Sequence, residues 1–124
     1  MAKSASELVS AAKAQVENLD VDAVEREMAS GDAVLVDLRE AEEVGNGRIP
    51  GSVHVPRGML EFRADPTSTY HQAPLDPSAR VILHCASGGR SALAAATLQS
   101  MGYTNVAHLD GGFNAWKDAG KTVE

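Results

Sequence analysis

The sequence predicts an α/β domain with a mainly parallel central sheet and helices on both of its faces. Two short apolar runs, residues 33–36 and 80–84, have the composition of strands that are buried on both faces. Segments with helical character alternate with them along the chain, which is the order expected when helical crossovers join parallel strands. The chain has 124 residues, enough for one domain with a hydrophobic core and too few for two ordinary ones.

The amino-terminal segment is predicted to form a peripheral helix over residues 4–17. Its apolar side chains recur near helical spacing at Leu8, Val9, Ala12 and Val16. The segment lacks the apolar stretch of a signal peptide, and no part of the chain has the length of a membrane span. We therefore expect a helical extension at residues 1–18, followed by the domain itself at residues 19–124.

The domain is expected to begin with a short extended piece and a second helix. Asp20 or Asp22 can cap this helix, and Glu25 can complete a capping box with Asp22. The sequence Ser30-Gly31-Asp32 then ends the helix before the first buried strand.

The carboxyl-terminal half continues the alternation of helices and strands. A helix is expected over residues 91–101, a weaker strand over residues 106–109 and a last helix over residues 114–119. Between the two buried strands, residues 56–79 form one long irregular connection with four of the five prolines, and a helical turn is expected at residues 59–63. A connection of this length in a compact domain is often functional.

Composition excludes several classes of function. The net charge of -6 provides no basic surface for nucleic acid or for an anionic membrane. A single cysteine excludes an internal disulfide and a cysteine-rich zinc site, and it fits a reducing cytoplasm. The four histidines, His54, His71, His84 and His108, show no metal-ligand spacing. We therefore expect neither a metal nor another cofactor.

Cys85 is the candidate nucleophile because it follows the second buried strand, and parallel sheets place their sites beyond the carboxyl ends of strands. Gly88 and Gly89 let several backbone N–H groups of the next loop point at one anion, and the following helix adds the positive end of its dipole. These groups, together with Arg90, should lower the pKa of the thiol. The alternative is that Cys85 is a small buried apolar residue.

The loop sequence from Cys85 to Ser91, CASGGRS, resembles the active loop of single-domain rhodaneses, which are sulfurtransferases that use a cysteine persulfide. Residues 37–43, 47–56 and 109–116 resemble further signatures of the same family in the same order. The resemblance implies a rhodanese-like domain in which Cys85 is catalytic and carries the sulfur. The loop residues would bind the donor: Ala86, Ser87, Gly88, Gly89, Arg90 and Ser91.

Several charged and aromatic residues outside the loop are expected to support the site or the core. Asp37 and Arg39 end a strand beside the Cys85 loop, and the resemblance implies that they mainly brace it. Arg57 on the long connection can help to hold an anionic donor, although a solvated charge explains it equally well. His84 should face away from the side that Cys85 faces. Trp116 is expected to anchor the last helix on the core.

The expected partners are a small sulfur donor and a thiol or cyanide acceptor, the thiol being small or carried by a protein. Thiosulfate-preferring relatives often carry a basic residue inside the loop, whereas residues 86–89 are neutral, which weakens thiosulfate as the donor. Arg48 and Val44 also depart from the family's usual histidine and aromatic residue. The oligomeric state is left open.

Two other functions compete with sulfur transfer. A phosphatase of related fold would use a C-x5-R loop that surrounds phosphate, whereas Cys85 to Arg90 is one residue shorter, and no residue is clearly nominated as the general acid. A non-catalytic binding module is the second alternative, and inactive relatives usually lose the cysteine that this chain keeps.

Overall fold

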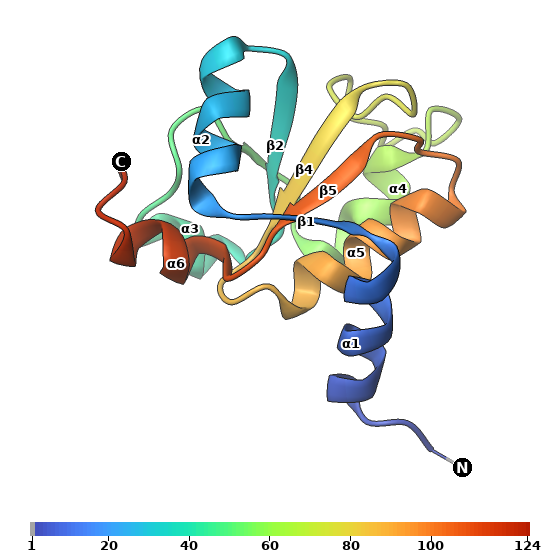
Figure 1. Ribbon diagram of the computed structural model, residues 1–124. Helices are drawn as coiled ribbons and strands as arrows, with labels where there is room; N and C mark the ends of the chain where they lie inside the picture. The colour runs from blue at the N-terminus through green and yellow to red at the C-terminus, as the bar shows by residue number, and fades with distance from the viewer. Residues whose placement is uncertain (1) are drawn as a thin grey trace.

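A five-stranded sheet forms the centre of the protein, and all its neighbouring strands run parallel (Figure 1). The computed structural model describes residues 2–124. In spatial order the strands are β1 (Glu17–Leu19), β5 (Val106–Leu109), β4 (Arg80–His84), β2 (Ala33–Asp37) and β3 (Val53–His54). The α/β class with a parallel sheet, predicted from the alternating pattern, is confirmed.

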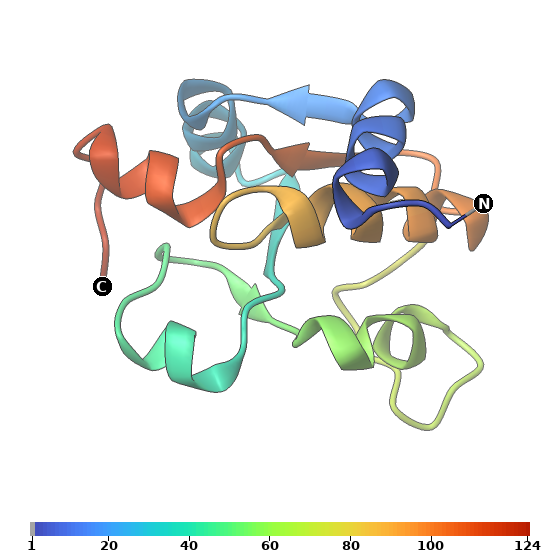
Figure 2. The ribbon, with the colours of Figure 1, turned by 90° about the horizontal axis from the view of Figure 1, so that it is seen from below.

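Helices cover both faces of the sheet, as Figures 1 and 2 show from two sides. One face packs against α1 (Ala5–Gln15), α4 (Leu60–Ala64) and α5 (Gly89–Ser100), and the other against α2 (Val21–Ser30) and α6 (Gly112–Asp118). The core is accordingly divided into two apolar clusters, one on each side of the sheet. Trp116 is buried in the second cluster and anchors α6 there, as predicted.

The amino-terminal helix α1 packs beside α5, and the chain then joins the edge of the sheet as β1 (Figure 2). Ser4 caps α1 in a capping box with Glu7, which satisfies free N–H groups of its first turn. The helix ends at Gln15, two residues before the predicted end at residue 17, because residues 17–19 pair with β5 instead. The extended piece expected near residues 18–20 is this edge strand.

Several boundaries differ from the predicted ones. Asp20 caps α2 by accepting a hydrogen bond from the Ala23 N–H, so the capping box predicted for Asp22 and Glu25 is wrong. Those two carboxylates instead both contact the Lys121 ammonium. Helices α5 and α6 each begin two residues earlier than predicted because both start at a glycine that follows a left-handed glycine cap.

The long connection between β3 and β4 is partly helical. It begins with the 3-10 turn η1 (Arg57–Met59) and α4, which extends the predicted turn. Asp65 and Asp76 then each accept bonds from the backbone and hydroxyl two residues ahead, which closes two tight polar turns. Between residues 2 and 124, no helix combines the length and apolarity needed to cross a membrane.

Two short elements went unpredicted. They are the five-residue helix α3 (Ala41–Gly45), which follows β2, and the two-residue edge strand β3. The end of the chain closes over the segment between them, since Arg48 and Glu124 exchange two backbone hydrogen bonds of 3.0 Å.

Candidate functional site

Cys85 lies one residue beyond the end of β4, at the edge where the carboxyl ends of the strands meet. Its side chain points to the face of the sheet that α5 covers, whereas His84 lies on the opposite face and stacks on Phe113 of α6. The predicted alternation is thus confirmed. The cysteine is only 1% exposed, so the protein encloses its sulfur almost completely.

The loop after Cys85 turns its backbone N–H groups toward the sulfur. The Gly88 N–H donates to Sγ over 3.2 Å. Gly88 adopts φ 110, a left-handed conformation that favours glycine and that caps α5. Gly89 then starts the helix, so the loop and the first turn of α5 together surround the sulfur.

These donors decide the pKa of the Cys85 thiol. Burial acts to raise this pKa, because it removes water from the charged thiolate. The Ser91 N–H and hydroxyl and the N–H groups of Gly88 and Ser87 outweigh burial and lower the pKa below its ordinary value. A lone apolar cysteine has no such set of donors, so the environment favours a reactive anion.

The carbonyl groups of Cys85 and Ala86, at the start of the loop, accept hydrogen bonds from the backbone of α6. The Phe113 N–H donates to the Cys85 carbonyl over 2.8 Å, and the Asn114 N–H donates to the Ala86 carbonyl over 3.0 Å. Gly112 permits this approach, since a Cβ on it would lie 2.6 Å from both carbonyl oxygens. This contact was not predicted from the sequence, although the paired glycines at 111 and 112 are its signal.

Arg90 extends from the first turn of α5 to Glu43 of α3. Its Nη1 and Nη2 atoms lie 2.8 and 3.0 Å from the two carboxylate oxygens, and both side chains are about a third exposed. The Cys85 sulfur is also among the groups that raise the pKa of Arg90. Two nitrogens of the guanidinium are therefore engaged by Glu43 rather than free to bind a donor.

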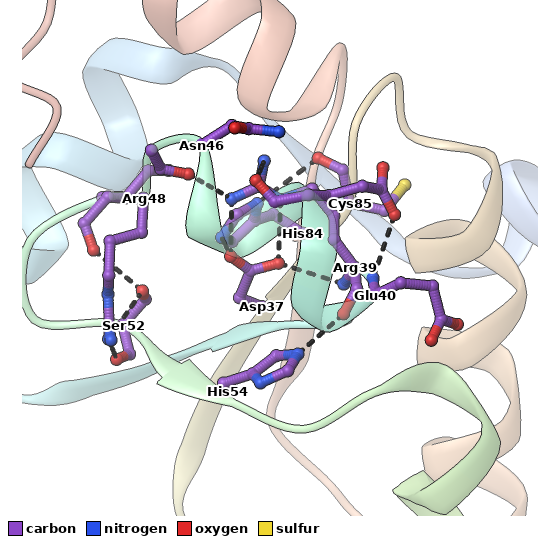
Figure 3. A network of polar contacts seen from close by, with 12 residues as sticks. Asp37, Arg39, Glu40, Asn46, Arg48, Ser52, His54, His84 and Cys85 are labelled. Atoms are coloured by element: carbon purple, nitrogen blue, oxygen red, sulfur yellow. Dashed lines mark hydrogen bonds and ion pairs between the residues drawn. The ribbon is translucent and has the colours of Figure 1, made fainter.

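Asp37 and Arg39 form a buried ion pair beside His84 (Figure 3). Arg39 donates to both carboxylate oxygens of Asp37 at 2.9 and 3.0 Å and lies 4.0 Å above the Phe113 ring. Burial raises the pKa of Asp37, but the bonds from Arg39 outweigh it and lower the pKa overall. His54 contacts the Arg39 carbonyl at 2.7 Å, so the cluster links β2, β3, β4 and α6.

Burial lowers the pKa of His84, more than the neighbouring Asp37 raises it. Its Nε2 has no hydrogen-bond partner among the described residues and lies 3.6 Å from Asp37. His84 is accordingly neutral and serves as part of the packing beneath Cys85, with Nδ1 3.3 Å from the Cys85 carbonyl.

Arg57 begins η1, on the long connection between β3 and β4. It pairs with Glu61 at 2.9 Å and lines a groove of about 480 Å³ between α1 and α5. The residues 86–90 do not line this groove. The structure thus brings Cys85, its loop, Asp37 and Arg39 together and gives Arg57 a different neighbourhood.

Comparison with known proteins agrees with this geometry. The model of the rhodanese-like domain family matches residues 20–119. A protein of Allochromatium vinosum named sulfurtransferase is 32% identical over 87% of this chain and 94% of its own length. A protein of Ectopseudomonas mendocina named thiosulfate sulfurtransferase GlpE is 36% identical over 74% of this chain and 77% of its own.

Solved structures show the same fold over nearly the whole chain. A Rhodopseudomonas palustris protein, described as of unknown function and a possible tyrosine phosphatase, is 40% identical with a TM-score of 0.94, covering 100% of this chain and 96% of its own. The human single-domain sulfurtransferase TSTD1 is 26% identical with a TM-score of 0.76, covering 83% and 96%. The chain therefore belongs to the rhodanese-like family, whose matched relatives include named sulfurtransferases.

Proposed function

We propose that the protein is a sulfurtransferase in which Cys85 takes sulfane sulfur from a donor, holds it as a persulfide and passes it to a thiol or cyanide. The observation that carries the proposal is the ring of donors around the Cys85 sulfur, from Ser87, Gly88 and Ser91, which lowers the thiol pKa despite burial. A stabilised thiolate is the form of cysteine that attacks another sulfur.

The chemistry divides into two displacements at sulfur. In the first, the Cys85 thiolate forms an S–S bond with the outer sulfur of the donor, and the donor's own bond to that sulfur breaks, so that thiosulfate would leave as sulfite. In the second, an acceptor thiolate or cyanide attacks the outer sulfur, and Cys85 leaves again as a thiolate. This is covalent catalysis, so ping-pong kinetics are expected.

The same donors serve both forms of the cysteine. A persulfide extends one atom beyond Sγ, toward the N–H groups of the loop and the first turn of α5. Its negative charge then lies where backbone N–H groups and the helix N-terminus favour an anion. The proposed partners are a small sulfur donor and an acceptor that is either small or a thiol carried by a protein. The proposed location is a reducing compartment such as the cytoplasm, because Cys85 must return to a free thiol in each cycle.

A phosphatase remains the second candidate, favoured by the description of the Rhodopseudomonas palustris structure. The loop length argues against it, since four residues separate Cys85 from Arg90, one fewer than in the C-x5-R loop that surrounds phosphate. Arg90 is also paired with Glu43. We expect slow or absent cleavage of p-nitrophenyl phosphate.

Mass spectrometry of the intact protein tests the proposal. After incubation with thiosulfate or a persulfide donor, the wild type should gain the mass of one sulfur atom, which cyanide or a thiol then removes. Cys85→Ser should gain none and should keep its thermal unfolding temperature, because serine nearly preserves the side-chain volume. Sulfur transfer by Cys85→Ser, or faster turnover of the aryl phosphate than of sulfur donors by the wild type, would overturn it.

A further inference from the structure

A series of hydrogen-bond contacts joins four side chains, Cys85, Ser91, His108 and Asn18, and ends at the amino-terminal strand β1. The Cys85 sulfur lies 3.7 Å from the Ser91 hydroxyl oxygen, and that oxygen lies 2.9 Å from Nδ1 of His108. Nε2 of His108 lies 2.7 Å from the Asn18 side-chain oxygen. Cys85, Ser91 and His108 are all at most 1% exposed, whereas Asn18 at the end of the series is exposed.

The sheet register produces this alignment. Asn18 of β1 pairs with His108 of β5, which in turn pairs with Leu83 of β4. Side chains two residues apart on a strand share a face, so Cys85 lies on the same face as Leu83 and His108. Ser91, in the first turn of α5, contacts Cys85 and His108 from the helix that covers this face. Each member therefore belongs to a different element of the fold.

Asn18 determines which nitrogen of His108 carries the proton. Its amide nitrogen donates to the carbonyls of Lys13 at 2.9 Å and Val16 at 3.1 Å, so its oxygen must face the imidazole. An amide oxygen only accepts, which requires a proton on Nε2 of His108. In the neutral ring Nδ1 is then an acceptor, and it accepts a hydrogen bond from the Ser91 hydroxyl. The Gly88 carbonyl is a longer alternative acceptor for that proton, at 3.2 Å.

We propose that His108 is a positioning residue that accepts the Cys85 proton through the Ser91 hydroxyl, and that Asn18 holds His108 in the tautomer this requires. The S–H bond of Cys85 breaks as its proton bonds to the Ser91 oxygen. The original Ser91 O–H bond breaks as that proton bonds to Nδ1. The product is a thiolate and an imidazolium separated by one hydroxyl, with charge and protons balanced.

The relay changes what Ser91 offers to the sulfur. While His108 is neutral, the Ser91 proton points to Nδ1, and the oxygen presents a lone pair to the thiol. Once His108 is protonated, Nδ1 donates to Ser91, and the Ser91 hydroxyl donates to the thiolate. The same arrangement stabilises Cys85 as the leaving group when it releases sulfur, so the inference deepens the proposed function and rests on it for that step.

The charges around His108 suit a base that is neutral at rest. Burial lowers its pKa, with Lys13 of α1 acting in the same direction and Asp110, just beyond β5, acting to raise it. Lys13 and Asp110 are 2.9 Å apart, so their effects on the ring oppose each other. Cys85 is the acidic group that hydrogen bonds connect to the imidazole, through the Ser91 hydroxyl.

The pH dependence of alkylation by iodoacetamide tests the proposal without any sulfur donor. In His108→Asn the side-chain oxygen can still accept from Ser91 but cannot take a proton. We expect the apparent thiol pKa of Cys85 to rise by about one unit in His108→Asn and in Ser91→Ala, and alkylation near neutral pH to slow roughly tenfold. His71→Asn is the matched control, because His71 contacts the Leu75 carbonyl in the long connection, and it should leave the profile unchanged.

NMR provides a second readout, and its first part, the tautomer of His108 in the wild type, does not depend on any variant folding. Long-range proton–nitrogen spectra should show His108 protonated at Nε2, and the ring should titrate differently in Cys85→Ser because coupled groups share their titration. Asn18→Ala should introduce the other tautomer. A His108 ring protonated at Nδ1 when neutral, or alkylation profiles that match the wild type in His108→Asn and Ser91→Ala, would overturn the relay. Neither measurement uses a sulfur donor, so a failure of the relay can be told apart from a failure of the proposed sulfur transfer.

Discussion

The guanidinium of Arg90, in the first turn of α5, and the carboxylate of Glu43, on α3, form a two-pronged ion pair with N–O distances of 2.8 and 3.0 Å. The bonds from Arg90 lower the pKa of Glu43 to about 2. Glu43 therefore stays charged at any physiological pH and offsets the positive charge that an anionic donor would meet. We therefore expect Arg90 to attract an anionic donor less strongly than an unpaired arginine would.

Replacement of Glu43 by glutamine should strengthen the binding of thiosulfate. The amide of the new side chain keeps an oxygen for the Glu40 N–H, a bond of 2.9 Å in the structure, but leaves the charge of Arg90 uncompensated. A partly exposed pair contributes about 0.2–1 kcal/mol, which corresponds to a KM lower by up to about fivefold. Steady-state kinetics at low ionic strength measure this, and added salt should reduce the difference.

The control is Glu42→Gln, which removes the same charge from an exposed neighbour on α3. Arg90→Ala should have the opposite effect and raise the KM for thiosulfate. If Glu43→Gln and Glu42→Gln give equal values of KM, the pair does not regulate donor binding.

Tyr103 should make the stability of the protein sensitive to alkaline pH. Its hydroxyl is buried and donates to the Ala64 carbonyl over 2.7 Å. Burial, with smaller effects of Asp76 and Asp65, raises the pKa of Tyr103 from 10.0 to about 12. A raised pKa means that the folded state favours the protonated form, so this stabilisation is complete below pH 10 and is lost as the pH rises toward about 12.

Tyr103→Phe should lower the free energy of unfolding at neutral pH by about 1–3 kcal/mol, because the Ala64 carbonyl loses its donor. Urea unfolding between neutral pH and about pH 12 should show the difference from wild type shrinking over the alkaline range. Tyr70→Phe, at a side chain that is 62% exposed, is the control. A constant difference between wild type and Tyr103→Phe across that range would contradict the assignment.

The parts of the fold that were predictable are those with a local cause. The runs 33–36 and 80–84 are continuous and apolar, so they predict buried strands whatever surrounds them. The position of Cys85 follows from them by the general rule for parallel sheets. By contrast, β3 has two residues and exists because β2 offers it a free edge, which is a tertiary cause without a local pattern.

The contacts that tune Cys85 could not be predicted for the same reason. Arg90 and Glu43 are 47 residues apart, and His108 and Asn18 are 90 apart. From the residue pattern alone, Arg90 is expected near the sulfur, and His108 is only a histidine without metal-ligand spacing. Their partners depend on the short helix α3 and on the register of β1 against β5, neither of which the residue pattern specifies.

Gly112 should be required for an intact Cys85 loop. It has φ +63, and an added Cβ would lie 2.6 Å from the carbonyl oxygens of Cys85 and Ala86. Those oxygens are backbone atoms that accept from Phe113 and Asn114, so they cannot move aside without disturbing the ring of donors around the sulfur.

Gly112→Ala combines two costs that a second variant can separate. The left-handed backbone alone costs a non-glycine residue roughly 1–2 kcal/mol. Gly120→Ala has a similar conformational cost at φ +76, but nothing lies within 4 Å of its added Cβ. We expect Gly112→Ala to lose more unfolding free energy than Gly120→Ala, and we expect only Gly112→Ala to slow alkylation of Cys85 near neutral pH. Equal losses in the two variants and an unchanged alkylation rate would mean that α6 does not shape the loop.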